Sequence, residues 1–142
     1  MQARILRGEW GLWIVRVLVG AIFIAHGSVR MIGAIHDPSI REFSRSLAQH
    51  GWVPALFWAW VVTLVEFLGG VCLFFGVGTR IAALAIMIEM AVAAVTSNLP
   101  RGFFWTRGGV EVPLVYAVLC AVLVLTAPRR PRPARGASTA FR

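Results

Sequence analysis

Cysteine and acidic residues are scarce in this chain, whose 142 residues include two cysteines and six aspartates or glutamates. Cys72 and Cys120 form no C-x-x-C pair, so the sequence indicates neither a thioredoxin-like site nor a zinc site. Both are expected to be small, buried apolar residues. The chain also has no glycine-rich phosphate loop, nucleophile elbow or metal-ligand cluster, which argues against the common classes of soluble enzyme.

Apolar residues, in contrast, make up 58% of the chain, compared with about 45–50% in soluble domains. Each of four apolar blocks is close to the roughly 20 residues that a helix needs to cross about 30 Å of hydrocarbon. The blocks cover about 10–32, 54–77, 80–99 and 109–127. Because helices satisfy their own backbone hydrogen bonds in lipid, the sequence predicts an all-α membrane protein, with a four-transmembrane-helix antiparallel bundle over residues 1–127.

The segments outside the blocks are predicted to be a short helix and a tail. Between the first two blocks, Ser39 can cap a short amphipathic helix that carries Ile40, Phe43 and Leu47 on one stripe, and this helix is expected to lie in the membrane interface. Residues 128–142 are rich in proline, arginine and alanine, which predicts a disordered basic tail.

The distribution of arginine predicts the orientation in the membrane. All fourteen basic residues are arginines, and four spans place both termini on one side. That side carries Arg4, Arg7, Arg80 and five tail arginines. The positive-inside rule therefore predicts cytoplasmic termini in a bacterial inner membrane. Attraction to the anionic leaflet accounts for the net charge of +8, and nucleic-acid binding is not indicated, because no soluble basic face is available.

Three of the six acidic residues lie in or at the edge of apolar blocks: Glu66, Glu89 and Glu111. An ionised carboxylate at the centre of a bilayer costs about 2.5–3.5 kcal/mol even on lenient insertion scales. Carboxylates in such positions must form ion pairs, hold a proton or take part in the protein's function. Arg16 and Arg30, in or beside the first block, are the candidate partners.

Helical geometry predicts which of these groups meet. With a rise of about 1.5 Å per residue, Arg16 comes within side-chain reach of Glu66 and Glu89 in the bundle core. Gly20 and Gly27 lie on the same helix face as Arg16, which predicts a close approach by a neighbouring helix.

A second group is expected at the outer end of the bundle. There Arg30 and Glu111 reach similar depth, and His26 lies about one turn deeper. Haem is disfavoured, because His36 and His50 fall in a loop and no second histidine lies at depth.

Two interpretations of these polar groups remain open. Buried ion pairs can simply fix the helix register. Alternatively, the carboxylates and His26 relay protons or bind a polar headgroup such as a quinone carbonyl. Two carboxylates beside one arginine cannot both ionise at low cost, so one of them is expected to keep its proton. A carboxyl group that keeps its proton in this way suits a proton relay.

Several stretches, in order, resemble the DoxX family of small four-helix membrane proteins. The first is Arg16 followed by His26-Gly27 and the basic residue Arg30. The others are the stretch 66–76 with 79–83, and the entry to the fourth block at 108–114; together they span about 12–125. The chain departs from relatives at its end, where Pro128-Arg129-Arg130-Pro131 replaces a Gly-rich stretch and Ser-x-Asp.

The resemblance implies an inner-membrane accessory or subunit protein of a quinone- or thiol-linked redox system, since some relatives are subunits of thiosulfate:quinone oxidoreductases. A membrane or peripheral redox protein would be its partner, and a homo-oligomer is also open. In this hypothesis Arg16 orients the carboxylates Glu66 and Glu89, which exchange protons, while His26, Arg30 and Glu111 form an outer gate. The alternatives are a small proton-coupled transporter, although no inverted repeats are evident, and a structural assembly subunit without a ligand.

Overall fold

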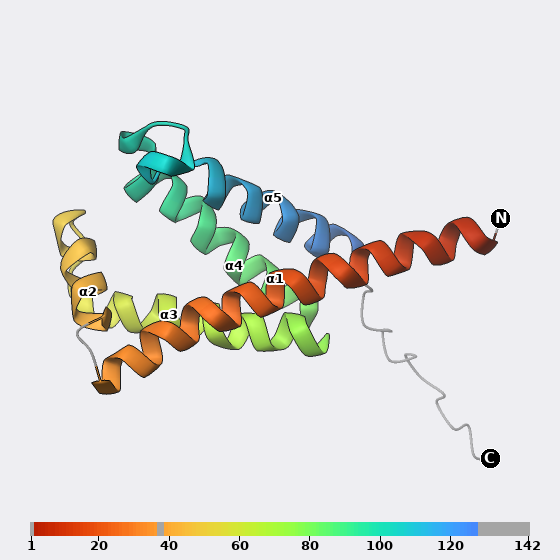
Figure 1. The fold of residues 1–142 in the computed structure, drawn as a ribbon, viewed down its shortest axis with the longest axis horizontal. Helices are drawn as coiled ribbons and strands as arrows, with labels where there is room; N and C mark the ends of the chain where they lie inside the picture. Colours follow the sequence, from red (N-terminus) through yellow and green to blue (C-terminus); the bar gives the residue numbers. More distant parts are fainter. Residues whose placement is uncertain (1, 37–38, 128–142) are drawn as a thin grey trace, which may run out of the picture.

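The computed structural model describes residues 2–36 and 39–127, so the predicted basic tail lies outside the described residues. Over these ranges the chain contains helices and no strand, which confirms the all-α expectation (Figure 1). The main helices are α1 (Gln2–His36), α2 (Ser39–Gln49), α3 (Ala55–Phe75), α4 (Thr79–Ala93) and α5 (Glu111–Thr126). They coincide with the four apolar blocks and with the short amphipathic helix predicted between the first two.

Three helical stretches are long and apolar enough to cross a membrane: Glu9–Gly33, Ala55–Phe75 and Thr79–Arg101. The chain is therefore a multi-pass membrane protein by helix length and composition. The fourth predicted span corresponds to α5, which is apolar but only 16 residues long. At 1.5 Å per residue it covers about 24 Å, less than the roughly 30 Å of a hydrocarbon core, so a fourth crossing stays a prediction.

Helices α1 and α3 run antiparallel and touch through glycines. A Cβ atom on Gly20 would lie 2.6 Å from the backbone nitrogen of Phe74, and one on Gly27 would lie 2.7 Å from the Cβ of Phe67. Gly70 of α3 faces the backbone of Ile24 in the same way, at 2.7 Å. The predicted close approach at Gly20 and Gly27 is confirmed, and α3 is the helix that approaches.

Helices α3 and α4 are joined by a tight glycine turn. At its start the Val77 N–H donates to the Cys72 carbonyl over 2.9 Å, and the Gly76 N–H donates to the Leu73 carbonyl over 3.2 Å. This is the Schellman arrangement, which needs a left-handed residue after the helix, and Gly76 has φ of 74°. The turn holds the ends of α3 and α4 together.

Beyond Ala93, α4 continues through the π-helical turn Ala94–Asn98 and the 3-10 turn Leu99–Arg101. A compact loop then leads to α5. The Asn98 side-chain amide donates to the Gly108 carbonyl over 2.7 Å, and the Val110 N–H donates to the Gly102 carbonyl over 3.0 Å. These bonds tie the loop to the end of the α4 extension.

The helices form two pairs that are close at one end and apart at the other. Figure 1 shows α1 with α3 and α4 with α5, meeting near the α3–α4 turn and separating toward the end where α2 lies. The main core includes Val19, Leu73, Ile86 and the buried Cys120. Ile40 and Leu47 of α2 pack with Ala59 of α3 in a second core, which confirms the predicted apolar stripe.

Candidate functional site

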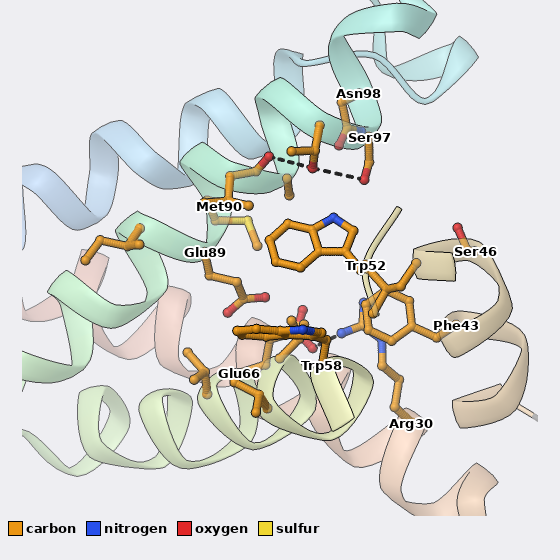
Figure 2. A pocket seen from close by; sticks show the side chains of 18 of the residues that line it. Arg30, Phe43, Ser46, Trp52, Trp58, Glu66, Glu89, Met90, Ser97 and Asn98 are labelled. Atoms are coloured by element: carbon orange, nitrogen blue, oxygen red, sulfur yellow. Dashed lines mark hydrogen bonds and ion pairs between the residues drawn. The ribbon is translucent and has the colours of Figure 1, made fainter. Parts of the chain in front are cut away.

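The space between the two helix pairs, where α2 closes it, contains a cavity of about 510 Å³ (Figure 2). Its lining comes from α2, α3, α4 with its extension, and the C-terminal part of α1. The volume is in the range of small-molecule sites, roughly 300–1,000 Å³. The polar residues that line it are Arg30, Ser46, Glu66, Glu89, Thr96, Ser97, Asn98 and Arg101.

An ion pair between Arg30 and Glu66 lies at the base of this cavity. Glu66 is only 3% exposed, because it shares the buried face of α3 with Thr63 and Gly70. Arg30 approaches from α1, where the Gly27 contact brings the two backbones together, and its guanidinium also lies 4.3 Å from the ring centroid of Phe43. A buried carboxylate is thus held by a charged hydrogen bond, and its partner is shielded by an aromatic ring.

Glu89 reaches the same place from α4 and interacts electrostatically with both Glu66 and Arg30. Ala85, Ala93 and Thr96 line the cavity on the same helix face as Glu89, so this face of α4 is turned toward protein rather than lipid. Its Oε2 atom is buried and has no hydrogen-bond partner among the described residues. Leaving such an atom without a partner costs about 1–3 kcal/mol. This oxygen is therefore suited to a proton or to a ligand's donor group.

Aromatic side chains make up the other side of the cavity. Trp52 and Trp58 pack edge to face with ring centroids 5.3 Å apart, and both line the cavity with Phe43 (Figure 2). None of these three aromatic residues was predicted to be a site residue. The apolar stripe that includes Phe43 and the nearby tryptophans is a signal that could have suggested an aromatic wall. Their approach to the glutamates depends on how α2 folds back onto α3.

Arg16 does not meet Glu66 and Glu89 as predicted. Its guanidinium lies at the C-terminal end of α3, where a Cβ atom on Gly76 would be 2.6 Å from Nη1 of Arg16. Gly76 is about 15 Å along the helix from Glu66. The first apolar block was predicted to begin at about residue 10, whereas α1 begins at Gln2 and its first turns extend past the other helices (Figure 1). Arg30 consequently takes the place expected for Arg16.

His26 and Glu111 lie apart from the Arg30 cluster as well. His26 is exposed, and its Nδ1–H donates to the Ile22 carbonyl of its own helix over 3.0 Å. Glu111 accepts a 3.0 Å hydrogen bond from the Trp105 backbone N–H and opens α5, where a carboxylate also suits the helix dipole. The structure therefore brings together Arg30, Glu66 and Glu89, and does not group His26 and Glu111 with Arg30.

The arrangement offers a small organic group both polar and apolar contacts. Arg30 supplies N–H donors and the two glutamates supply carboxyl groups, while Trp52 and Trp58 present apolar faces and edges. Among the described residues, no three histidine, cysteine, aspartate or glutamate side chains converge on one point. A planar ring with oxygen substituents fits this combination of groups.

Comparisons with known proteins agree with the helical pattern. The model of the DoxX family matches residues 11–99. A Bacillus subtilis (strain 168) protein named "Putative oxidoreductase CatD" is 31% identical over 121 residues, which cover 85% of this chain and 82% of that protein. No solved structure matches the chain significantly. The family match covers more than half of the chain and includes Arg30, Glu66 and Glu89, so the chain belongs to the DoxX family.

Proposed function

We propose that this protein binds a quinone headgroup in the cavity and serves as an accessory or subunit protein of a membrane redox system. The observation that carries the proposal is the buried Oε2 of Glu89, which has no hydrogen-bond partner among the described residues although the Glu89 carboxyl group also contacts that of Glu66. It lies beside the Arg30–Glu66 ion pair, inside a cavity with an aromatic wall. The name of the Bacillus subtilis relative, "Putative oxidoreductase CatD", agrees with a redox-linked role.

The chemistry of a quinone matches these groups. Its carbonyl oxygens accept hydrogen bonds, for which the Arg30 guanidinium is a strong donor. Reduction of a quinone to a quinol adds two electrons and two protons. The carboxyl groups of Glu66 and Glu89 are placed to pass protons to and from the ring oxygens. In this proposal the electrons come from a redox partner protein, and a thiol-linked partner is compatible with it.

The cellular setting is part of the same proposal. We place the protein in a bacterial inner membrane, as one four-helix transmembrane domain over residues 1–127 with a basic cytoplasmic tail at 128–142. Both termini face the cytoplasm, because the arginine count favours that side. The interfacial position of α2 and a homo-oligomeric state are compatible with this setting.

Quinone binding is tested with the full-length protein in lipid nanodiscs, titrated with decylubiquinone and monitored by quenching of tryptophan fluorescence, because Trp52 and Trp58 line the cavity. The variant Glu66→Gln removes the counter-charge that positions Arg30, so binding should weaken about tenfold, the value of one charge-assisted hydrogen bond. Glu42→Gln is the matched control, because Glu42 is exposed and does not line the cavity.

Unchanged affinity in folded Glu66→Gln protein would contradict the proposal. Two other results would favour the remaining alternatives. Uptake of a solute driven by a pH gradient in proteoliposomes would indicate a proton-coupled transporter. A partner enzyme that co-purifies in mild detergent, without any quinone binding, would indicate a structural assembly subunit.

A further inference from the structure

A second hollow lies between α4 and α5, on the other side of α4 from the cavity. It has a volume of about 650 Å³ and is more open. We call it the α4–α5 groove. The residues that line it and not the cavity are Met87, Ala91, Val95, Ala117, Val118 and Ala121. All six side chains are apolar. Three of them are alanines, whose small side chains leave space between the two helices along the groove.

The groove and the cavity border on one another. Both are lined by Ile88, Val92 and Thr96, which follow one another at four-residue intervals on the α4 segment. Residues at this spacing stand on one face of the helix and form a ridge. Ile88 is 54% exposed and Val92 is 38% exposed, and the Thr96 hydroxyl donates to the Val92 carbonyl over 2.8 Å. The polar cavity and the apolar groove are thus separated by one row of apolar surface.

The position of the groove restricts what can fill it. It lies on the stretch Thr79–Arg101, which is long and apolar enough to span a membrane, so hydrocarbon is its expected surrounding. From Met87 to Val95 it follows about 12 Å of helix, the length of an extended chain of roughly ten carbons. An alkyl or isoprenoid chain fits this shape. Because the groove and the cavity share the row of Ile88, Val92 and Thr96, one molecule can place a headgroup in the cavity and its tail in the groove.

We infer that the ligand of the cavity carries a long apolar tail, which crosses the ridge of Ile88, Val92 and Thr96 and lies in the α4–α5 groove. The inference rests on the proposed binding of a quinone headgroup, and it makes the substrate class a tailed, lipid-soluble quinone. In a bilayer the tail exchanges contacts with lipid for contacts with protein. The favourable free energy of tail binding therefore comes from packing rather than from the hydrophobic effect. The expected contribution is about threefold to tenfold in affinity.

The test compares two probes that share one benzoquinone ring, decylubiquinone and the same ring without a tail. Both are titrated against the full-length protein in nanodiscs. For each variant the ratio of the two dissociation constants is compared with the wild-type ratio, because partition of each probe into lipid then cancels. Ala91→Phe fills the groove from an exposed position, and Val118→Trp is a second variant from the opposite wall. Ala25→Phe is the control, since Ala25 is exposed on α1 and lines neither hollow.

Both groove variants should reduce the preference for the tailed probe about threefold to tenfold and leave the affinity for the tail-less ring unchanged. Ala25→Phe should keep the wild-type ratio. Unchanged ratios in Ala91→Phe and Val118→Trp would overturn the inference while the headgroup site stands. If these variants instead change the oligomeric mass and keep the ratio, a second copy of the chain occupies the groove and the inference is wrong. Failure of both probes to bind wild-type protein would overturn the proposed function and the inference with it.

Discussion

At the scale of single residues, burial of the Glu66 carboxylate carries a high energetic cost, and Arg30 is the side chain whose opposite charge offsets it. The Arg30 side chain is 24% exposed and that of Glu66 is 4% exposed, so the pair is shielded mainly on the glutamate's side. Removing one partner of a buried pair leaves the other charge without compensation. The effect of the pair on stability is therefore expected to appear mainly when one of its two partners is removed.

Arg30→Ala should lower the free energy of unfolding by about 3 kcal/mol, the low end of the range for breaking a buried pair, because Arg30 is partly exposed. The double variant Arg30→Ala with Glu66→Leu should recover most of this loss, since no unpaired charge remains. Unfolding in a denaturing detergent, followed by circular dichroism, measures both. A double variant as unstable as Arg30→Ala would show that the loss comes from packing and not from the stranded carboxylate.

Single residues also show which contacts of the candidate site could be predicted from the sequence. It predicted that glutamates in apolar blocks would meet an arginine of the first helix, because an unpaired carboxylate is costly in lipid. It could not choose Arg30 over Arg16, because that choice depends on how far α1 slides along α3. Contacts of Gly20, Gly27 and Gly70 fix that position, and hydropathy alone does not report it.

At the scale of helices, the pairing of α1 with α3 depends on backbone contact at glycines. Apolar block length and turn residues predicted where the helices lie, because both signals are local, but α1 begins at Gln2, well before the predicted block. The π-helical turn Ala94–Asn98, the short α5 and the fold of α2 against α3 were not predicted. The packing of α2 on α3 depends on contacts between segments far apart in the sequence, which local patterns do not report.

Gly20→Ala should destabilise the protein by about 1–3 kcal/mol, because the new Cβ would lie 2.6 Å from the backbone of Phe74 and force α1 away from α3. The matched control is Gly11→Ala on the same helix, where no atom lies within 4 Å of the new Cβ. This control should be neutral or gain up to about 1 kcal/mol from helix propensity. Detergent-induced unfolding compares them, and equal effects would refute the glycine contact as the determinant of α1–α3 pairing.

At the scale of the whole molecule, one end differs from the other. The α3–α4 turn and Arg16 lie at one end, and α2 with the compact 102–110 loop lies at the other, where the helix pairs separate (Figure 1). The arginine count predicts that the first end, with both termini, faces the cytoplasm.

This orientation is testable with single cysteines in a background where Cys72 and Cys120 are replaced by alanine. Thr106→Cys, in the exposed 102–110 loop, should react in intact spheroplasts with a maleimide that cannot cross membranes. Ser138→Cys, in the tail, should react only after lysis. Labelling of both in intact spheroplasts would show that α5 does not cross the membrane, and the reverse pattern would contradict a cytoplasmic C-terminus.

The cavity extends from the level of Glu66 and Glu89 toward the end that carries α2, and this one-sidedness has an energetic consequence. Protons exchanged by the two carboxyl groups would pass to the water on that face, which is the periplasm if the termini are cytoplasmic. Oxidation of a quinol there would release its protons outside the cell and add to the transmembrane proton gradient. Reduction of a quinone at the same position would draw protons from outside and dissipate it.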